Sequence, residues 1–303
     1  MSTLKNKIDF AVILCVKNAN PNGDPIDGNR PRTNYENYGE ITDVCIKRKI
    51  RDRLLERFSA LEGDAKKGQA ILVQSDDRKV DDAMSIGSRA KKFLGDKLGS
   101  AETTTLACKE WIDVRAFGQL FALSGEKSKN KKGKQKDTEK NDSESENNDA
   151  AGVSVGIRGP VTIQSAFSVA PIEITSIQIT KSASGEGDGN KKSSDTMGMK
   201  HRVEHGIYKL YGSMNPQLAE RTGFSDQDAE AIKQVLPKLF ENDESSARPA
   251  GSMEILKVIW WQHNCKSGQY SSAKVHQSLS VNADGTYSIA TLDELVPEEI
   301  NGR

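Results

Sequence analysis

A short apolar stretch near the start of the chain, Ile8-Asp-Phe-Ala-Val-Ile-Leu-Cys-Val16, sets the first limit on the fold. It is rich in β-branched residues and far shorter than the ~18 residues of a membrane helix, so it predicts a central strand covered on both faces. Turn formers fill 18–29. Thr42 then suits a helix N-cap, after which apolar residues recur every four positions at Ile46, Ile50, Leu54 and Phe58. The chain is therefore predicted to begin with a strand, a long loop and a helix.

Helices and strands are predicted to interleave along the rest of the chain. We expect a helix within 83–98 and another that begins at Ser225, with Asp228 at its third position and Pro237 shortening it. Strands are expected at 172–179 and 253–261, and a short strand or buried segment at 69–74. The predicted fold class is α+β, in a single domain that spans 1–303 with insertions.

Composition excludes several classes of protein. Lys and Arg number 43 and so do Asp and Glu, so no overall field attracts nucleic acid and such a role needs a local basic surface. The four cysteines are scattered, which indicates reduced thiols and a cytoplasmic protein. The apolar run near the N-terminus lacks the flanks of a signal peptide, so secreted, disulfide-framework and membrane classes are excluded.

Two polar segments interrupt the predicted elements. Residues 125–150 hold a basic block followed by an acidic block and no large apolar side chain, so we expect a disordered charged insertion there. Residues 182–195 are rich in Gly and Ser, and we expect a flexible tip.

One sequence motif fits a metal site. His201-Arg-Val-Glu-His205 matches the H-x-x-E-H pattern of inverted zinc peptidases, which requires both histidines on one helical face. Val203 and Ile207 continue a helical spacing, whereas Tyr208 favours a strand. A metal-dependent hydrolase is kept as an enzymatic alternative.

The first helix and the loop before it carry a concentration of cations. Six lie between Lys47 and Arg57, and Lys47 and Arg51 share one helical face. Arg30 and Arg32 approach the same helix on a loop rich in Gly and Asn. These groups suit a surface that follows a phosphate backbone, although solvated charges on an amphipathic helix explain the pattern equally well.

Two further arginines lie beside glycines. Arg115 suits either contact with a ligand or, as the structural alternative, a pair with Asp113 or another acid that fixes a turn. Arg158 has no local acid between Gly156 and Pro160, which favours ligand contact.

The order of these motifs resembles a known family. The strings Asn20-Pro-Asn-Gly-Asp-Pro25, Gly28-Asn-Arg-Pro-Arg32 and Gly39-Glu-Ile-Thr-Asp-Val-Cys-Ile-Lys-Arg-Lys-Ile-Arg51 are similar to those of the Cas7 family. That family forms the backbone of type I CRISPR Cascade complexes, and this chain looks most like the type I-C branch. Later strings at 113–118, 159–160, 197–201 and 206–212 follow at fitting positions.

The resemblance implies a modified RRM-like (ferredoxin-like) palm with inserted fingers and a thumb. It further implies a non-catalytic protein without a cofactor, several copies of which polymerise along one CRISPR RNA and present its bases for pairing with target DNA. The implied partners are the guide RNA, the target DNA strand, further copies of the chain and the other Cascade subunits: the guide 5′-end-capping subunit, the large subunit and the small subunit. No membrane is implied.

The resemblance also suggests site residues. Lys47 and Arg51, with Thr42 at the helix cap, match positions that contact RNA in the family. With the residues inferred from charge and loop context, the predicted RNA-binding set is Lys47, Arg51, Thr42, Arg48, Arg30, Arg32, Arg158, Asn20 and Asn22. The thumb is expected at roughly 170–205, with Met197 or Met199 as the wedge that kinks the RNA.

Two other functions stay open from the sequence alone. Related type III subunits cut RNA with a thumb-loop aspartate, and Asp188 and Asp195 occupy the corresponding region, so an RNA-cleaving subunit is the second enzymatic alternative beside the His201 and His205 site. The third is an RNA-binding module outside CRISPR systems, which would show sequence preference and no assembly along the strand.

Overall fold

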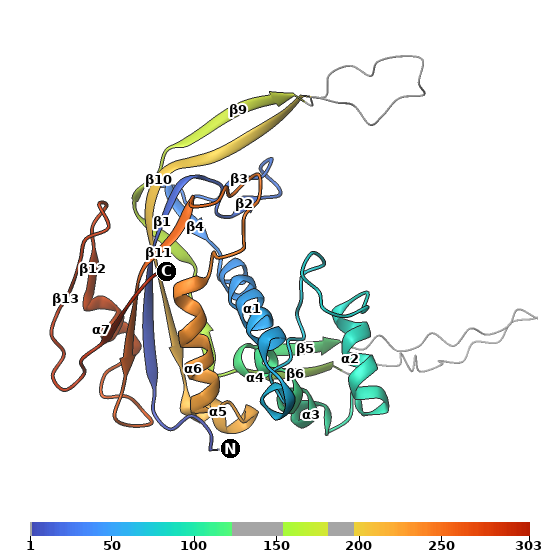
Figure 1. The fold of residues 1–303 in the computed structure, drawn as a ribbon. Coiled ribbons are helices and arrows are strands. Elements are labelled where there is room, and N and C mark those ends of the chain that lie inside the picture. Colours follow the sequence, from blue (N-terminus) through green and yellow to red (C-terminus); the bar gives the residue numbers. More distant parts are fainter. Residues whose placement is uncertain (1, 123–153, 181–196) are drawn as a thin grey trace, which may run out of the picture.

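The computed structural model describes residues 2–122, 154–180 and 197–303. The predicted insertion at 125–150 and the predicted tip at 182–195 lie outside the described residues. The centre of the fold is an antiparallel sheet in the order β14-β11-β1-β10-β8-β4, with β7 and β9 also paired to β10 (Figure 1). Its strands are β1 (Ile8–Ala19), β4 (Tyr38–Ile41), β7 (Val161–Ile163), β8 (Ala166–Pro171), β9 (Ile174–Thr180), β10 (Met197–Met214), β11 (Met253–Gln262) and β14 (Glu298–Asn301).

The apolar run at the N-terminus forms the middle of this sheet, as predicted. Strand β1 pairs with β10 on one side and β11 on the other, and its residues from Phe10 to Leu14 have no exposed surface. Both faces of β1 are therefore covered, which explains why the run does not alternate between apolar and polar residues.

Two helices cover one face of the sheet. Helix α1 (Asp43–Ala60) buries Ile46, Ile50 and Leu54 in the same core as α6 (Asp226–Val235), so the predicted apolar stripe is confirmed. Ser225 and Asp228 form a reciprocal capping box at the start of α6, also as predicted. The α-helix ends at Val235, and Pro237 lies in the following 3-10 turn, η3 (Leu236–Lys238). A short helix, α5 (Pro216–Thr222), precedes α6.

The C-terminal segment covers part of the opposite face. Helix α7 (Ser272–Gln277) and the hairpin of β12 (Leu279–Val281) and β13 (Tyr287–Ile289) pack over β1 and β11 around Trp261. The two faces of the sheet therefore have separate cores.

A third unit packs around Trp111. It contains the expected helix within 83–98 and a hairpin between α4 and the central sheet. Its elements are η1 (Gly63–Lys66), α2 (Ile86–Leu94), η2 (Gly95–Lys97), α3 (Thr103–Glu110), α4 (Ile112–Phe117), β5 (Gly118–Ala122) and β6 (Ser154–Arg158).

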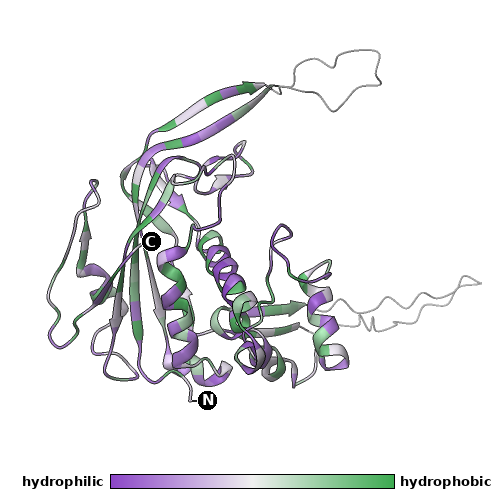
Figure 2. Cartoon of the chain, viewed as in Figure 1, coloured by the Kyte–Doolittle hydropathy of each residue, from purple (hydrophilic) through white to green (hydrophobic). Residues whose placement is uncertain are grey.

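The long strand β10 has two roles. Its C-terminal part pairs with β1, whereas its N-terminal part pairs with β9, from Met197 opposite Thr180 to Val203 opposite Ile174. The hairpin of β9 and β10 extends beyond the sheet (Figure 1), and hydrophobic and hydrophilic residues alternate along both of its strands (Figure 2). The predicted strand at 172–179 is therefore confirmed, with bounds shifted by one or two residues.

Candidate nucleic-acid interface

The loop between β1 and α1 is fixed by its own asparagines. Asn22 Oδ1 accepts hydrogen bonds from the Thr42 backbone N–H and hydroxyl, both at 2.9 Å, while Thr42 Oγ1 caps α1 by accepting from the Cys45 N–H. Asn20 is buried and donates from Nδ2 to the Asn29 carbonyl at 2.6 Å. These predicted RNA-binding residues therefore hold the loop against the helix, and the short hairpin of β2 (Gly23–Asp24) and β3 (Arg30–Pro31) lies between them.

The cations of α1 differ in how strongly the protein engages them. Lys47 Nζ lies 2.9 Å from Asp43 in a partly exposed pair within one helical turn. Arg48 pairs with Asp77 at 3.1 Å on the exposed surface. Such pairs contribute little to stability, because solvent screens them.

Arg51 is held more firmly than the other two cations. Its Nε donates to Asp113 Oδ2 at 3.1 Å, and its guanidinium carbon lies 5.1 Å from the centre of the Phe117 ring. Asp113 is fully buried and also accepts from the N–H groups of Leu72 and Val73. Within the described residues, Arg51 donates a hydrogen bond only from its Nε, so its two terminal nitrogens stay available to a ligand.

One of the two loop cations connects the loop to the long hairpin. Arg30 donates from Nη1 to Ser176 Oγ on β9 at 3.3 Å, and Ser176 Oγ lies 2.8 Å from His201 Nδ1 on β10. Arg32 pairs with Asp24 at 3.3 Å. The structure therefore brings one predicted cation, Arg30, into direct contact with the hairpin.

A hollow of about 340 Å³ lies where the loop, the hairpin and the 246–247 turn meet. Its lining combines apolar side chains of the hairpin with polar groups of the loop: Asn20, Gly28, Asn29, Ile179, Met199, Lys200, His201, Ser246 and Ala247. Met199 is 54% exposed and Met197, the other predicted wedge, is 66% exposed. Exposed methionines beside a cation-bearing loop suit a surface that holds a polyanion and contacts its apolar bases. Sequence reasoning did not single out Ser176, which no motif marks, or Lys200, which lies within the string at 197–201.

Arg158 lies on a different element, at the end of β6 in the fingers. Its side chain is exposed, and no hydrogen bond or ion pair connects it to another residue that the structure describes. Gly118, opposite it, has φ +82°, and a Cβ there would lie 2.2 Å from the Ile157 carbonyl oxygen. Glycine is therefore required beneath Arg158 for the hairpin to pair.

Arg115 has the structural role that was the alternative for it. Its Nε and Nη2 donate to the two carboxylate oxygens of buried Asp228 at 2.9 and 2.7 Å. Asp228 belongs to the α6 capping box, so this pair fastens the unit around Trp111 to helix α6.

The H-x-x-E-H motif does not form the helix that a zinc peptidase requires. His201 and His205 lie on strand β10, where four residues span roughly 13 Å, too far for one metal ion. His205 Nε2 instead lies 3.6 Å from Cys15 Sγ, and burial raises the pKa of that thiol, which disfavours the nucleophilic thiolate. Within 2–122, 154–180 and 197–303, no group of three or more His, Cys, Asp or Glu side chains is placed to bind a metal. Asp188 and Asp195 lie outside the described residues.

The fold and this surface define an α+β protein with a cation-bearing loop set against a long β-hairpin. A family model described as CRISPR-associated protein Cas7 matches residues 6–296, so the chain belongs to that family. It is 26% identical to a CRISPR-associated protein Cas7 of Haloferax volcanii, over 98% of this chain and 81% of the relative.

Two solved structures are also similar to this chain. One is described as a CRISPR RNA-guided surveillance complex, pre-nicking, with a TM-score of 0.49, 14% identity and coverage of 92% of this chain and 84% of the other. The second, a CRISPR RNA-guided surveillance complex, has a TM-score of 0.45, also at 14% identity, with coverage of 92% and 77%. Separately, no helix among the described residues is both long and apolar enough to span a membrane.

Proposed function

We propose that this chain is the guide-RNA-binding backbone subunit of a type I Cascade complex, of the I-C branch. Several copies assemble along one CRISPR RNA, hold its phosphate backbone without catalysis and present its bases to the target DNA strand. The remaining partners are the guide 5′-end-capping, large and small subunits. The Cas7 match over 6–296 carries this proposal.

The topology supports an RRM-like palm for this role. The elements β1, α1, β8, β10, α6 and β11 follow in the order β-α-β-β-α-β, and the sheet order β11-β1-β10-β8 places the first and third strands in the centre. In this proposal the hairpin of β9 and β10 is the thumb and the unit around Trp111 is the fingers.

The contacts around the thumb support binding to backbone and not to base edges. Lys47, Arg51 and Arg30 present cations to a phosphate chain, and Arg158 offers a further one from the fingers. A subunit that accepts any guide must rely on contacts to phosphate and sugar, because base contacts would select sequences. Met197 and Met199 are proposed as the apolar wedge that kinks the RNA.

The test compares Lys47→Ala with the control Lys91→Ala, which removes an exposed cation from α2 in the fingers. Affinity for single-stranded RNAs of unrelated sequence is measured across a salt series. Lys47→Ala should weaken binding to all RNAs alike and reduce the salt slope by about 0.7 for one lost phosphate contact, whereas Lys91→Ala should not. Unchanged affinity in Lys47→Ala, or a loss for some sequences only, would contradict the proposed site.

A further inference from the structure

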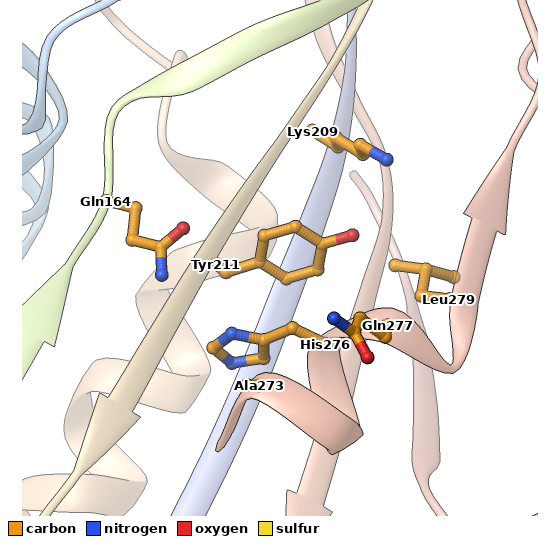
Figure 3. Close-up of a pocket in the computed structure, with 7 residues that line it drawn as sticks. All are labelled: Gln164, Lys209, Tyr211, Ala273, His276, Gln277 and Leu279. Atoms are coloured by element: carbon orange, nitrogen blue, oxygen red, sulfur yellow. The ribbon is translucent and has the colours of Figure 1, made fainter. Parts of the chain in front are cut away.

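A second hollow lies on the face of the sheet opposite α1 and α6. It has a volume of about 480 Å³ and lies beside α7 (Figure 3). Lys209 and Tyr211 project into it from β10, with Gln164 on one side and residues of the C-terminal segment on the other. The lining is Gln164, Lys209, Tyr211, Ala273, His276, Gln277 and Leu279, and none of these is acidic.

Four polar side chains of this hollow are not engaged by any other residue that the structure describes. Within the part of the chain that the structure describes, no hydrogen bond or ion pair involves the Lys209 ammonium, the Tyr211 hydroxyl or the side-chain amides of Gln164 and Gln277. The ammonium lies 5.9 Å from the centre of the Tyr211 ring. Lys257, in contrast, lies at the same 5.9 Å from the Tyr287 ring but donates to Asn301 at 2.6 Å. Lys209 is thus available to an external anion.

The groups behind the hollow leave the charge of Lys209 intact. His276 stacks on Tyr211 with ring centres 4.6 Å apart, and burial lowers the pKa of this histidine, so it is neutral near pH 7. The buried Asp9 carboxylate beneath it is already paired with Lys7 at 3.0 Å and hydrogen-bonded to His263 at 2.9 Å. The hollow therefore presents one positive charge, and burial raises the pKa of Tyr211, which keeps its hydroxyl as a donor.

An exposed aromatic residue extends this surface along the sheet. Phe167 on β8 is directly opposite Lys209 in the β8–β10 register, so the two side chains share a face. It is 41% exposed, although it is a large apolar residue on a strand. Glu40 on β4 pairs with Phe167 from the side away from β10. Its negative charge repels a bound anion, which therefore lies on the Lys209 side of Phe167.

We infer that the back-face site, defined as Gln164, Phe167, Lys209, Tyr211 and Gln277, binds one nucleotide of a single nucleic-acid strand. A base stacks on Phe167, while Lys209, Tyr211 and the two amides bind the adjacent phosphodiester. One cation, neutral donors and a flat aromatic match one phosphate and one base of any sequence. The inference goes beyond the proposed function, because the guide RNA is assigned to the α1 and thumb side.

The experiment uses the full chain saturated with guide RNA and a fluorescent oligothymidylate that cannot pair with the guide. Anisotropy at several salt concentrations is measured for Phe167→Ser, Lys209→Gln and the matched control Lys257→Gln. Phe167→Ser should weaken oligothymidylate binding by at least about 5-fold through loss of stacking. Lys209→Gln should lower the salt slope by about 0.7, as expected for one phosphate. Lys257→Gln should match the wild type, and all three variants should bind guide RNA normally.

Two results overturn the inference. One is oligothymidylate binding that is unchanged in both Phe167→Ser and Lys209→Gln. The other is altered self-association of these variants, measured by sedimentation, with oligothymidylate binding intact, which would make this face a protein interface. The same titration on the RNA-free chain separates this test from the proposed function, because the back-face site is predicted to bind even if guide RNA does not.

Discussion

Replacing Arg51 by alanine should destabilise the protein much more than the loss of one cation from an amphipathic helix suggests. The side chain is 13% exposed and its partner Asp113 is fully buried, so the substitution leaves a carboxylate without its counter-charge. Breaking a buried pair from one side costs about 3–5 kcal/mol, and the two backbone N–H donors that remain on Asp113 favour the lower end. Loss of the contact with the Phe117 ring adds roughly 0.5–1 kcal/mol. The expected loss is about 3–4 kcal/mol.

Urea unfolding followed by tryptophan fluorescence measures this loss. With a denaturant slope of about 3 kcal/mol/M, the midpoint of Arg51→Ala should fall by at least ~1 M. Arg57→Ala is the matched control on the same helix, because Arg57 donates only to the neutral amide of Gln69 among the residues that the structure describes, and it should cost about 1 kcal/mol. Lys47→Ala, which breaks a partly exposed pair, should cost about 0.5 kcal/mol.

The same variants separate structure from RNA binding. Asp113→Asn also breaks the ion pair but keeps the Arg51 guanidinium, so it should lower stability while retaining RNA affinity in the folded protein. Arg51→Ala should lose both. An Arg51→Ala midpoint within the range of Arg57→Ala would refute the buried-pair reasoning.

Two further predictions concern stability. Arg115→Ala should lower the free energy of unfolding by about 3–5 kcal/mol, because it leaves the buried Asp228 carboxylate of the α6 cap without its counter-charge. Arg115→Lys should recover little of this loss, since lysine cannot form the bidentate pair. A urea midpoint close to wild type would contradict this. Burial lowers the pKa of His276, so as pH falls below about 6.5 the unfolded chain takes up a proton that the folded chain does not, and stability declines. His276→Phe should remove that share of the decline between pH 7.5 and 5.5, and an unchanged pH dependence would show that His276 does not cause it.

Local signals in the sequence predicted much of the fold. The period of four from Ile46 to Leu54 and the Ser225–Asp228 capping box depend on neighbours within one or two helical turns, and the structure confirms both. Strand β10 was harder, because 201–214 contains both helical spacing and strand-forming tyrosines. Pairing with β1 over its C-terminal part decides in favour of the strand, and that pairing joins residues about 200 positions apart.

The candidate site was less predictable, for a related reason. The sequence places Arg51 among the cations of the first helix and Arg115 near a glycine, but their partners, Asp113 and Asp228, are 62 and 113 residues away. Whether a cation faces solvent or a buried carboxylate depends on those tertiary contacts. The sequence did not predict the back-face site. Phe167 and Gln277 lie in no motif, and nothing in the string at 206–212 indicates that Lys209 is their neighbour in space.

Binding stoichiometry on single-stranded RNAs of increasing length tests the central claim most directly. Mass measurements on the saturated complexes count the copies bound to each RNA. An RNA-binding backbone subunit should add one copy for each constant, small increment of nucleotides, whatever the sequence. One copy at every length, or cleavage of the RNA, would contradict the account.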